Sequence, residues 1–314
     1  MSKSTWVPPG HFYSPLVDPT DPHVRDILDH PEDLYLDGEM GIQMDDEAML
    51  RLLHSISAYY KDLPFPQQQS SEWRYHFENP AFCYGDASVY FGMLRHFRPK
   101  RVIEIGSGYS SCLAMDTNDH FLDKTTKLSF IDPYPQILFN LIGEDPEYRK
   151  NVIVSKLQDV PTHTFRELQA GDFLFIDSSH IAKMGSDVND YLFRILPCLN
   201  EGVIIQIHDI QYPFEYGSEW IDQENRSWNE AYALRAFLQF NQSFRILYFN
   251  HYVFLKFRDL LQKLMPNCVQ NCGASIWIEK TQSQYRSSHS YVRLTRLIYE
   301  SRAIFRKVRR RLQR

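Results

Sequence analysis

The sequence predicts an α/β fold in which helices cover both faces of a mostly parallel sheet. Short apolar runs of strand character recur between residues 100 and 280, and helical patterns separate most of them. Five of these strands are separated by crossovers long enough for a helix, which is typical of βαβ units. The seven runs are Arg101–Ile105, Leu128–Asp132, Val152–Ser155, Phe173–Asp177, Val203–His208, Phe244–Phe249 and Ser275–Glu279. The last run follows a loop with Gly and Cys, so it can return antiparallel, either at the edge or between neighbours.

The residues before the sheet predict a helical cap. Residues 1–75 are polar, proline-containing and acidic, and they read as an N-terminal cap or arm packed on a main domain of residues 76–280. Within the cap, apolar residues at helical spacing predict a helix near Glu47–Tyr60. A second helical pattern, Asn79–Phe97, leads into the first strand, and Pro99 marks its end.

A glycine turn follows the first strand. Gly106 and Gly108, with Ser107 between them, stand directly after this β-branched run, and glycine lets the backbone approach a ligand that a Cβ atom would block. Ser110 or Ser111 can begin the next helix, whose free N–H groups attract polar ligand atoms. The pattern indicates a nucleoside-cofactor site.

Three acidic residues add to this site. Asp132 ends the second strand, where a carboxylate can accept hydrogen bonds from ribose hydroxyls; the alternative is a simple helix cap. Glu104 lies inside the first strand, where a carboxylate needs a donor such as a ligand amino group or a backbone N–H, unless it faces water at the strand edge. Asp159 follows the third strand, where it can reach an adenine amino group or serve as a turn residue.

Polar residues also end two further strands. Asp177 and His180 follow the fourth strand, and His208 and Asp209 follow the fifth. Because the carboxyl ends of parallel strands meet at one edge of the sheet, we expect these four side chains to converge. Such a cluster can hold a divalent metal ion or supply a general base, and a neutral histidine suits the second role near pH 7. The segment Ser186–Tyr191 is interpreted as a helix cap.

The loop after Asp209 is rich in aromatic residues, which either wall a substrate pocket or pack the loop onto the core. They are Tyr212, Phe214, Tyr216, Trp220 and Trp228.

Composition narrows the class of protein. The net charge of −5 combines a tail, residues 281–314, with ten Lys and Arg and one acid, and an acidic remainder, so we expect no nucleic-acid surface on the main domain. The tail reads as a basic amphipathic helix that suits a membrane surface, RNA, or an acidic partner surface, including a second copy in a homodimer. Five scattered cysteines and an N-terminus without an apolar signal core favour reduced thiols and a cytoplasmic location.

The motifs together resemble bacterial class I S-adenosylmethionine (SAM) methyltransferases. The similarity is strongest to the O-methyltransferase-like group of natural-product and glycan biosynthesis, and it extends to about Lys280. It rests on GHFYSP, EIGSGYSS, FIDPYP, LQDVP, GDFLFIDSSH, IQIHDIQYPFEYGSEW and GASIWIEK. The resemblance implies a Rossmann-like sheet with a seventh, antiparallel strand inserted, and SAM at the carboxyl edge of the sheet.

The resemblance also implies roles for particular residues. Glu104, Gly106, Ser107 and Gly108 would lie by the methionine part of SAM, Asp132 on the ribose and Asp159 near the adenine, with Asp177 closing the site. In catechol-type relatives an aspartate after the fourth strand and an Asp-Asn pair after the fifth bind magnesium. Asp177 matches the first, but His208-Asp209 stands in place of the pair. The implied metal set is Asp177, His208 and Asp209; without a metal ion, His180 or His208, beside Asp177, is the implied base.

The sequence hypothesis is therefore SAM-dependent O-methylation of a small molecule. Two rival hypotheses remain at this point. One is an NAD(P)-dependent oxidoreductase, against which stand Ser111 in place of a third glycine and the lack of an evident Tyr-x-x-x-Lys pair. The other is a non-catalytic SAM-binding partner protein whose tail carries the function.

Overall fold

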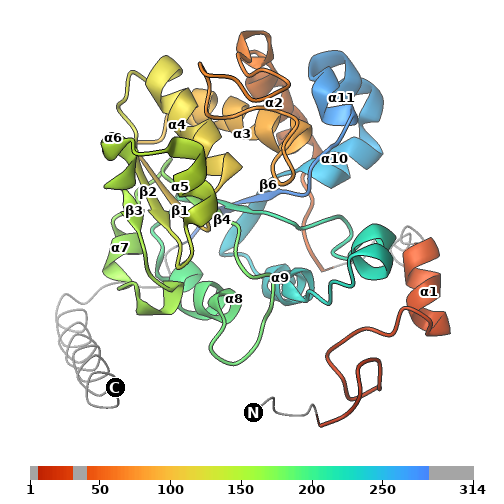
Figure 1. Cartoon of the computed structure of the whole chain (residues 1–314). Coiled ribbons are helices and arrows are strands. Elements are labelled where there is room, and N and C mark those ends of the chain that lie inside the picture. Colours follow the sequence, from red (N-terminus) through yellow and green to blue (C-terminus); the bar gives the residue numbers. More distant parts are fainter. Residues whose placement is uncertain (1–5, 31–40, 283–314) are drawn as a thin grey trace, which may run out of the picture.

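A seven-stranded mixed sheet forms the centre of the computed structural model, which describes residues 6–30 and 41–282 (Figure 1). The strand order is β3-β2-β1-β4-β5-β7-β6, and only β7 runs against its neighbours. The predicted fold class is thus confirmed, and β7 lies between two strands. The strands are β1 (Arg101–Ile105), β2 (Lys127–Ile131), β3 (Val152–Ile153), β4 (Phe173–Ile176), β5 (Ile204–Ile207), β6 (Phe244–Phe249) and β7 (Ile276–Lys280).

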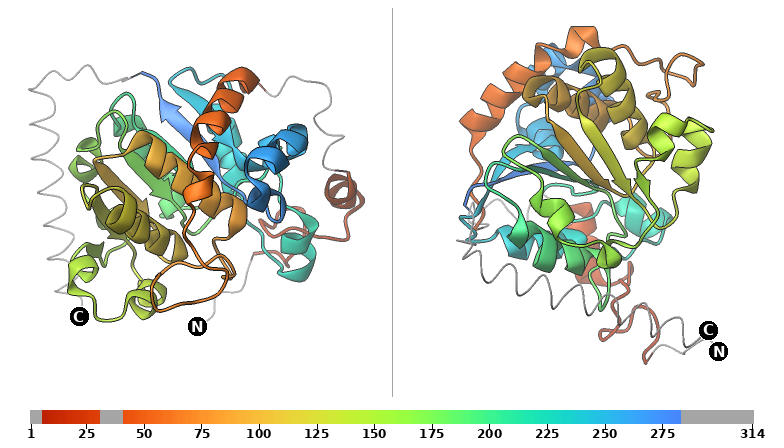
Figure 2. Two further views of the ribbon diagram at one scale, coloured as in Figure 1. Left: turned by 90° about the horizontal axis from the view of Figure 1, so that it is seen from above. Right: turned by 90° about the vertical axis from the view of Figure 1, so that its left-hand side faces the viewer.

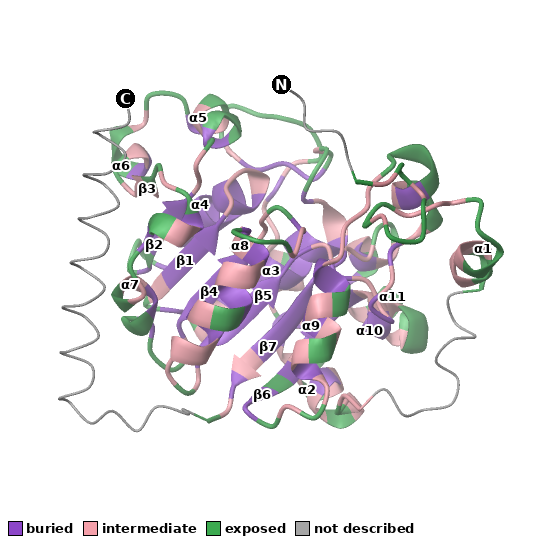
Figure 3. Ribbon diagram, turned by 90° about the horizontal axis from the view of Figure 1, so that it is seen from below, coloured by how far each residue is buried: buried purple, intermediate pink, exposed green. Residues whose placement is uncertain are grey.

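Helices cover both faces of the sheet. Figures 1 and 2 show α2, α3, α4, α10 and α11 on one face, and Figure 3 shows α8 and α9 across the other. Every residue of β4 and β5 is buried, as expected for central strands covered on both sides. The helices are α1 (Pro22–Asp29), α2 (Asp46–Ser57), α3 (Tyr84–Phe97), α4 (Tyr109–Phe121), α5 (Gln136–Ile142), α6 (Pro146–Arg149), α7 (His163–Arg166), α8 (Asp187–Asp190), α9 (Glu230–Leu238), α10 (Asn250–Lys256) and α11 (Arg258–Leu264).

The cap helix α2 belongs to the same hydrophobic core as the sheet. Its residues Met49, Leu53 and Ile56 are fully buried and pack with residues of α3. The approach of the two helices is close, because a Cβ atom at Gly92 of α3 would lie 2.9 Å from the Cβ atom of Ile56. The helix predicted near Glu47–Tyr60 is confirmed, with a one-turn 3₁₀ helix at Tyr60–Asp62 after its end.

Helix α3 begins five residues later than the sequence pattern predicts. The side chain of Asn79 holds the preceding segment in a turn: its carbonyl accepts hydrogen bonds from the N–H groups of Ala81 and Phe82. Its amide group donates to the carbonyls of His76 and Phe82. Asparagine often forms such turns in place of a helix start. The delayed start places Asp86 in the first turn of α3.

The N-terminal arm, residues 6–30, contacts the segment that follows β5. Arg25 of α1 forms an ion pair with Asp222 at 2.9 Å. The N–H group of Val17 donates to the hydroxyl of Ser227 at 3.3 Å. The arm therefore lies beside the aromatic loop that the sequence singled out, as Figure 1 shows for α1.

The remaining sequence predictions concern the basic tail and the cysteines. The basic tail lies outside the described residues from position 283 onward. Within residues 6–30 and 41–282, no helix has the length and apolar character needed to cross a membrane. All five cysteines are free thiols.

Candidate active site

The glycine turn after β1 is held between the ends of two neighbouring strands. Gly106 has φ +88°, and its N–H group donates to the carbonyl of Ile131 at the end of β2. A Cβ atom at this position would lie 1.8 Å from the carbonyl oxygen of Asp177, just after β4. Both the backbone angle and the lack of space therefore require glycine here.

A cavity of about 610 Å³ opens beside this turn. It is lined at the strand ends by Gly106, Ser107, Asp132 and Asp177. The carboxylate of Asp132 is oriented by its neighbours: the Ser107 hydroxyl donates to one oxygen at 2.7 Å, and the N–H group of Tyr134 donates to the other at 2.7 Å. We call this space the cofactor-side cavity.

Glu104 lies beneath the turn and is fully buried. One of its oxygens accepts hydrogen bonds from Ser110 at 2.6 Å and Ser111 at 2.8 Å. The other oxygen has no hydrogen-bond partner among the described residues. Burial raises the pKa of this carboxyl to about 8, despite the two serine hydrogen bonds. The Glu104 side chain thus stabilises the first turn of α4. The next two residues of the chain, Ile105 and Gly106, line the cavity.

The other two residues predicted to bind cofactor, Gly108 and Asp159, do not line the cavity but directly follow Ser107 and Gln158, which do. Gly108 is the residue before α4, and its N–H group donates to the hydroxyl of Ser111 at 3.0 Å. The helix thus begins at Tyr109, before the two serines that the sequence favoured. Asp159 ends a 3₁₀ turn whose residues Leu157 and Gln158 line the cavity.

A second cavity, of about 620 Å³, lies on the other side of Asp177. We call it the acceptor-side cavity. Its floor includes Asp177, His208 and Asp209 at the ends of β4 and β5, and Asp86 of α3. Asp177 is common to the walls of both cavities. The predicted convergence of strand-end residues is therefore present at the junction of two spaces.

His180 faces this junction with one ring nitrogen. Its Nε2 atom lies 3.4 Å from a carboxylate oxygen of Asp177 and 3.4 Å from one of Asp209. Its Nδ1 atom lies 2.7 Å from the carboxylate of Glu230 in the first turn of α9, which also accepts from the Tyr191 hydroxyl at 2.6 Å. The backbone of His180 is left-handed, with φ +57°.

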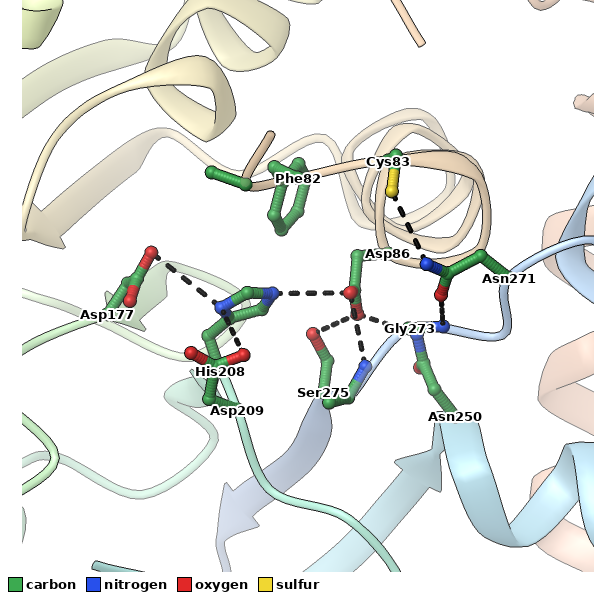
Figure 4. Close-up of polar contacts among 12 residues, drawn as sticks. Phe82, Cys83, Asp86, Asp177, His208, Asp209, Asn250, Asn271, Gly273 and Ser275 are labelled. Carbon is green, nitrogen blue, oxygen red and sulfur yellow. Dashed lines mark hydrogen bonds and ion pairs between the residues drawn. The ribbon is translucent and has the colours of Figure 1, made fainter. Parts of the chain in front are cut away.

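Figure 4 shows His208 with its two ring nitrogens facing different carboxylates. Its Nδ1 atom lies 3.4 Å from Asp209 and 3.7 Å from Asp177, while its Nε2 atom lies 3.2 Å from the carboxylate of Asp86. Asp86 is held by the N–H group of Ala274 at 3.1 Å and the amide of Asn250 at 3.0 Å. Each histidine therefore places one nitrogen at the junction and the other against a buried carboxylate.

The cluster strongly perturbs the acidity of its members. Burial alone would lower the pKa of both histidines, but hydrogen bonds to Asp177 and Glu230 raise the pKa of His180 to about 10. The charges of Asp209, Asp86 and Asp177 raise the pKa of His208 well above its usual value. Burial would raise the pKa of Asp177, but the two histidines hold it below its usual range. Burial raises the pKa of Asp209. As it stands here, the cluster contains protonated imidazoles, not the neutral base that the unperturbed pKa of histidine suggests.

Sequence reasoning missed the two carboxylates behind the histidines. Asp86 is an acid in the first turn of an otherwise apolar helix, and Glu230 is an acid in the first turn of α9. Acids in these positions are commonly explained by the helix dipole, so the pattern alone does not single them out. The unusual signal is their burial, at 5% and 1% exposure, which only the structure shows.

The aromatic loop divides between the two roles that the sequence left open. Trp220 and Trp228 line the acceptor-side cavity, and the guanidinium of Arg226 lies over both rings, 5.0 and 4.3 Å from their centroids. Phe214 and Tyr216 are buried in the core. The Trp228 ring also lies 4.2 Å from the His180 ring. The tryptophans thus belong to the candidate site, and Phe214 and Tyr216 anchor the loop.

Comparisons with known proteins identify a domain in the central part of the chain. Residues 103–210 match a family model described as a methyltransferase domain, and this span includes the end of β1, all of β4 and β5, and the polar residues that follow them. An uncharacterized protein of Archaeoglobus fulgidus is 33% identical over 175 residues, which cover 52% of this chain and 73% of that protein. This relative is archaeal, so it lends no support to the bacterial origin that the motifs suggested.

Two solved structures are similar in fold at low identity. The O-methyltransferase TomG from Streptomyces achromogenes, in complex with SAM, is 13% identical with a TM-score of 0.39, covering 80% of this chain and 96% of that one. The Podospora anserina methyltransferase PaMTH1, bound to SAH (S-adenosylhomocysteine), is 15% identical with a TM-score of 0.38, covering 81% and 96%. Likenesses at this level concern the fold alone.

Proposed function

We propose that this chain transfers a methyl group from SAM to a hydroxyl group of a small molecule, a natural product or a sugar. The premise is that the chain belongs to the same protein family as the Archaeoglobus fulgidus protein and contains a methyltransferase domain. The observation that carries the proposal is the position of Asp177 in the walls of two cavities of similar size. A transferase needs adjoining spaces for donor and acceptor, because the reacting atoms must meet in line.

The residues of the cofactor-side cavity fit SAM. The turn at Gly106 and Ser107 lines the cavity, and Asp132 presents an oriented carboxylate where ribose hydroxyls can donate to it. Its volume, about 610 Å³, lies within the usual range for small-molecule sites. In this proposal Asp132 and Ser107 hold the ribose, and Asp159 lies on the adenine side.

The chemistry then takes place at the junction. When bound, SAM supplies an electrophilic methyl group on a positively charged sulfur. The chain positions the acceptor hydroxyl in the acceptor-side cavity, and the carboxylate of Asp177, flanked by His180 and His208, takes up the hydroxyl proton as the new C–O bond forms and the C–S bond breaks. The products are SAH, the methyl ether and this proton.

The acceptor-side cavity favours a ring that carries polar groups. Trp220 and Trp228 offer aromatic faces, while Glu219, Glu224 and Arg226 offer charged groups for hydrogen bonds. Sugars and polyhydroxylated aromatic rings both combine flat or ring-shaped apolar faces with hydroxyls. This wall supports the choice of a small acceptor.

Calorimetry with SAM and SAH tests the proposal directly. We expect both to bind the wild-type chain, and Asp132→Ala to weaken that binding. His208→Ala is expected to abolish methyl transfer while SAM binding persists. Methyl transfer is measured by mass spectrometry with a panel of hydroxylated small molecules. Absence of SAM binding at millimolar concentration would overturn the proposal, as would tight NADPH binding in its place. Deleting residues 291–314 separates an enzyme, which keeps most of its activity, from a partner protein whose tail carries the function.

A further inference from the structure

We infer that the N-terminal arm, residues 6–30, positions one wall of the acceptor-side cavity, and that the ion pair between Arg25 and Asp222 sets how tightly this cavity binds the acceptor. We call residues 217–228 the wall segment. The inference rests on the proposed function, because that proposal assigns the acceptor to this cavity. Arg25 and Asp222 do not line the cavity, so they act as positioning residues.

The wall segment supplies aromatic faces and charged groups to the cavity. Its lining residues are Glu219, Trp220, Glu224, Arg226 and Trp228. Two other residues of the segment, Asp222 and Ser227, contact the arm, and Figure 1 shows α1 beside this part of the chain. Residues that contact the arm thus alternate along the chain with residues that line the cavity. A displacement of the arm would therefore move the lining.

The middle of the wall segment has few anchors of its own. Ile221 is buried, whereas the four residues that follow it are exposed. Residues Glu219–Gln223 form a single π-helical turn, a rare conformation that is frequent at functional sites. Segments with few buried apolar contacts open locally at a low cost in free energy. The position of this turn should therefore depend on contacts from outside the segment.

The arm provides such contacts at two points. The Nη1 atom of Arg25 lies 2.9 and 3.0 Å from the two carboxylate oxygens of Asp222, while Nη2 lies 3.2 Å from Asp29 of α1. The N–H group of Val17 donates to the hydroxyl of Ser227 at 3.3 Å. The side chain of Val17 also packs against the hydrophobic core, so the arm itself is anchored. The two contacts thus connect the wall segment to a fixed part of the molecule.

The ion pair is of a kind that salt weakens. The side chains of Arg25 and Asp222 are 34% and 33% exposed. Exposed charges attract each other less as ionic strength rises. None of the residues of α1 is buried, and a helix of this length is marginal on its own, so packing contributes little to replace the lost attraction. We therefore expect acceptor binding to weaken at high salt.

The end of the wall segment nearest the reacting groups is held separately. The Trp228 ring lies 4.2 Å from the His180 ring, and the N–H group of the next residue, Asn229, donates to the His180 carbonyl at 3.2 Å. The Asn229 side chain accepts from the N–H group of Ala182 at 2.6 Å. Loss of the arm contact should therefore raise the KM for the acceptor and leave kcat nearly unchanged.

Hydrogen–deuterium exchange of the full-length chain tests the inference without SAM or an acceptor. We expect Arg25→Ala and Asp222→Ala each to raise amide exchange within residues 217–228 about 2- to 5-fold, the range that loss of an exposed ion pair allows. The double variant should exchange no faster than either single variant, because the two residues share one contact. Arg51→Ala is the matched control, because it removes an exposed ion pair with Glu47 in α2. It should leave exchange in the wall segment unchanged.

Kinetics then tests the consequence for the acceptor. With an acceptor found in the panel of hydroxylated small molecules, each variant should show a KM about 2- to 5-fold higher, with kcat and the Kd for SAM unchanged. The rise of KM with salt should be smaller in Arg25→Ala than in the wild-type chain.

Several results would overturn the inference. They are unchanged exchange within residues 217–228, faster exchange throughout the chain, additive effects in the double variant, and a fall in kcat at constant KM. If no compound of the panel is methylated, the exchange measurements decide alone. Because exchange needs neither SAM nor acceptor, its failure is distinct from a failure of the proposed function.

Discussion

The two cavities that meet at Asp177 are built in different ways. The cofactor-side cavity is made largely by short segments that directly follow β1, β2 and β4, three strands that are adjacent in the sheet. The acceptor-side cavity gathers residues from positions 80 to 274, including α3, the aromatic loop and the segment before β7. The cofactor-side cavity therefore depends on local strand–turn–helix units, and the acceptor-side cavity depends on how distant segments pack.

The cavities also differ in their electrostatics. Backbone and single oriented groups such as Asp132 shape the cofactor-side cavity, whose lining includes Ile105, Ile131 and Leu157. Buried, mutually perturbing charges lie under the acceptor-side cavity, where two histidines contact four carboxylates. From this difference we expect ligand binding in the cofactor-side cavity to depend mainly on the shape of its lining. Function in the acceptor-side cavity should depend mainly on the charges of its lining residues.

The largest expected effect is that of Gly106→Ala on the cofactor side. The added Cβ would lie 1.8 Å from a backbone oxygen at φ +88°, so we expect a loss of about 3–5 kcal/mol in the free energy of unfolding, with no SAM binding. Gly143→Ala is the matched control, because Gly143 has φ +60° with nothing within 4 Å. It should cost only about 1 kcal/mol. Chemical denaturation of both variants measures the difference, and equal losses would refute the role of close approach.

Asp132→Ala should separate the two regions by ligand. Losing a carboxylate that accepts hydrogen bonds from the ribose should weaken SAM binding about 10- to 100-fold. The KM for the acceptor should not change, because Asp132 does not line the acceptor-side cavity. Calorimetry with SAM and steady-state kinetics with the acceptor make the comparison, and Asp259→Ala in α11 serves as a control at an exposed acid. Equal weakening of both ligands would mean that the regions are not independent.

Trp220→Ala should have the opposite pattern. Removing an aromatic face from the acceptor-side cavity should raise the KM for the acceptor about 10-fold, which corresponds to about 1.4 kcal/mol. The Kd for SAM should stay constant. Steady-state kinetics with calorimetry gives both values, and Phe193→Ala controls for loss of an exposed aromatic residue. A parallel rise in the Kd for SAM would contradict the division of the cavities.

A pH dependence of stability is expected from Glu104. Its pKa in the folded chain is about 8, above its ordinary value, so the folded state binds this proton more tightly than the unfolded state. Stability from this group is therefore present at acidic pH and falls as the pH rises towards 8, by on the order of 1 kcal/mol per pH unit. Glu104→Gln should flatten the slope between pH 6 and 8 in urea denaturation. Identical slopes for the two proteins would show that Glu104 is not the group whose titration changes the stability.

Helix starts and strand order show where local pattern stops being sufficient. All seven strands lie where the apolar runs predict them, because β-branched runs between polar turns suit only buried strands in this context. The place of β7 was open from sequence, since its apolar pattern is the same at an edge or between neighbours. Its pairing on both sides, Ile207 with Ile276 and Phe249 with Ile276, decides the position. Helix α3 starts late because of Asn79, a single side-chain turn.

The sequence by itself determined which strand-end residues line the cofactor-side cavity. Gly106, Ser107, Asp132 and Asp177 follow strands within a few residues, and the order of a parallel sheet brings such positions together. Only the tertiary structure decided what lies behind the histidines. Asp86 meets His208 across 122 residues and Glu230 meets His180 across 50, and each acid comes from a helix start whose local pattern has an ordinary explanation. Contacts of this kind depend on how helices pack against the sheet, which no local pattern of residues encodes.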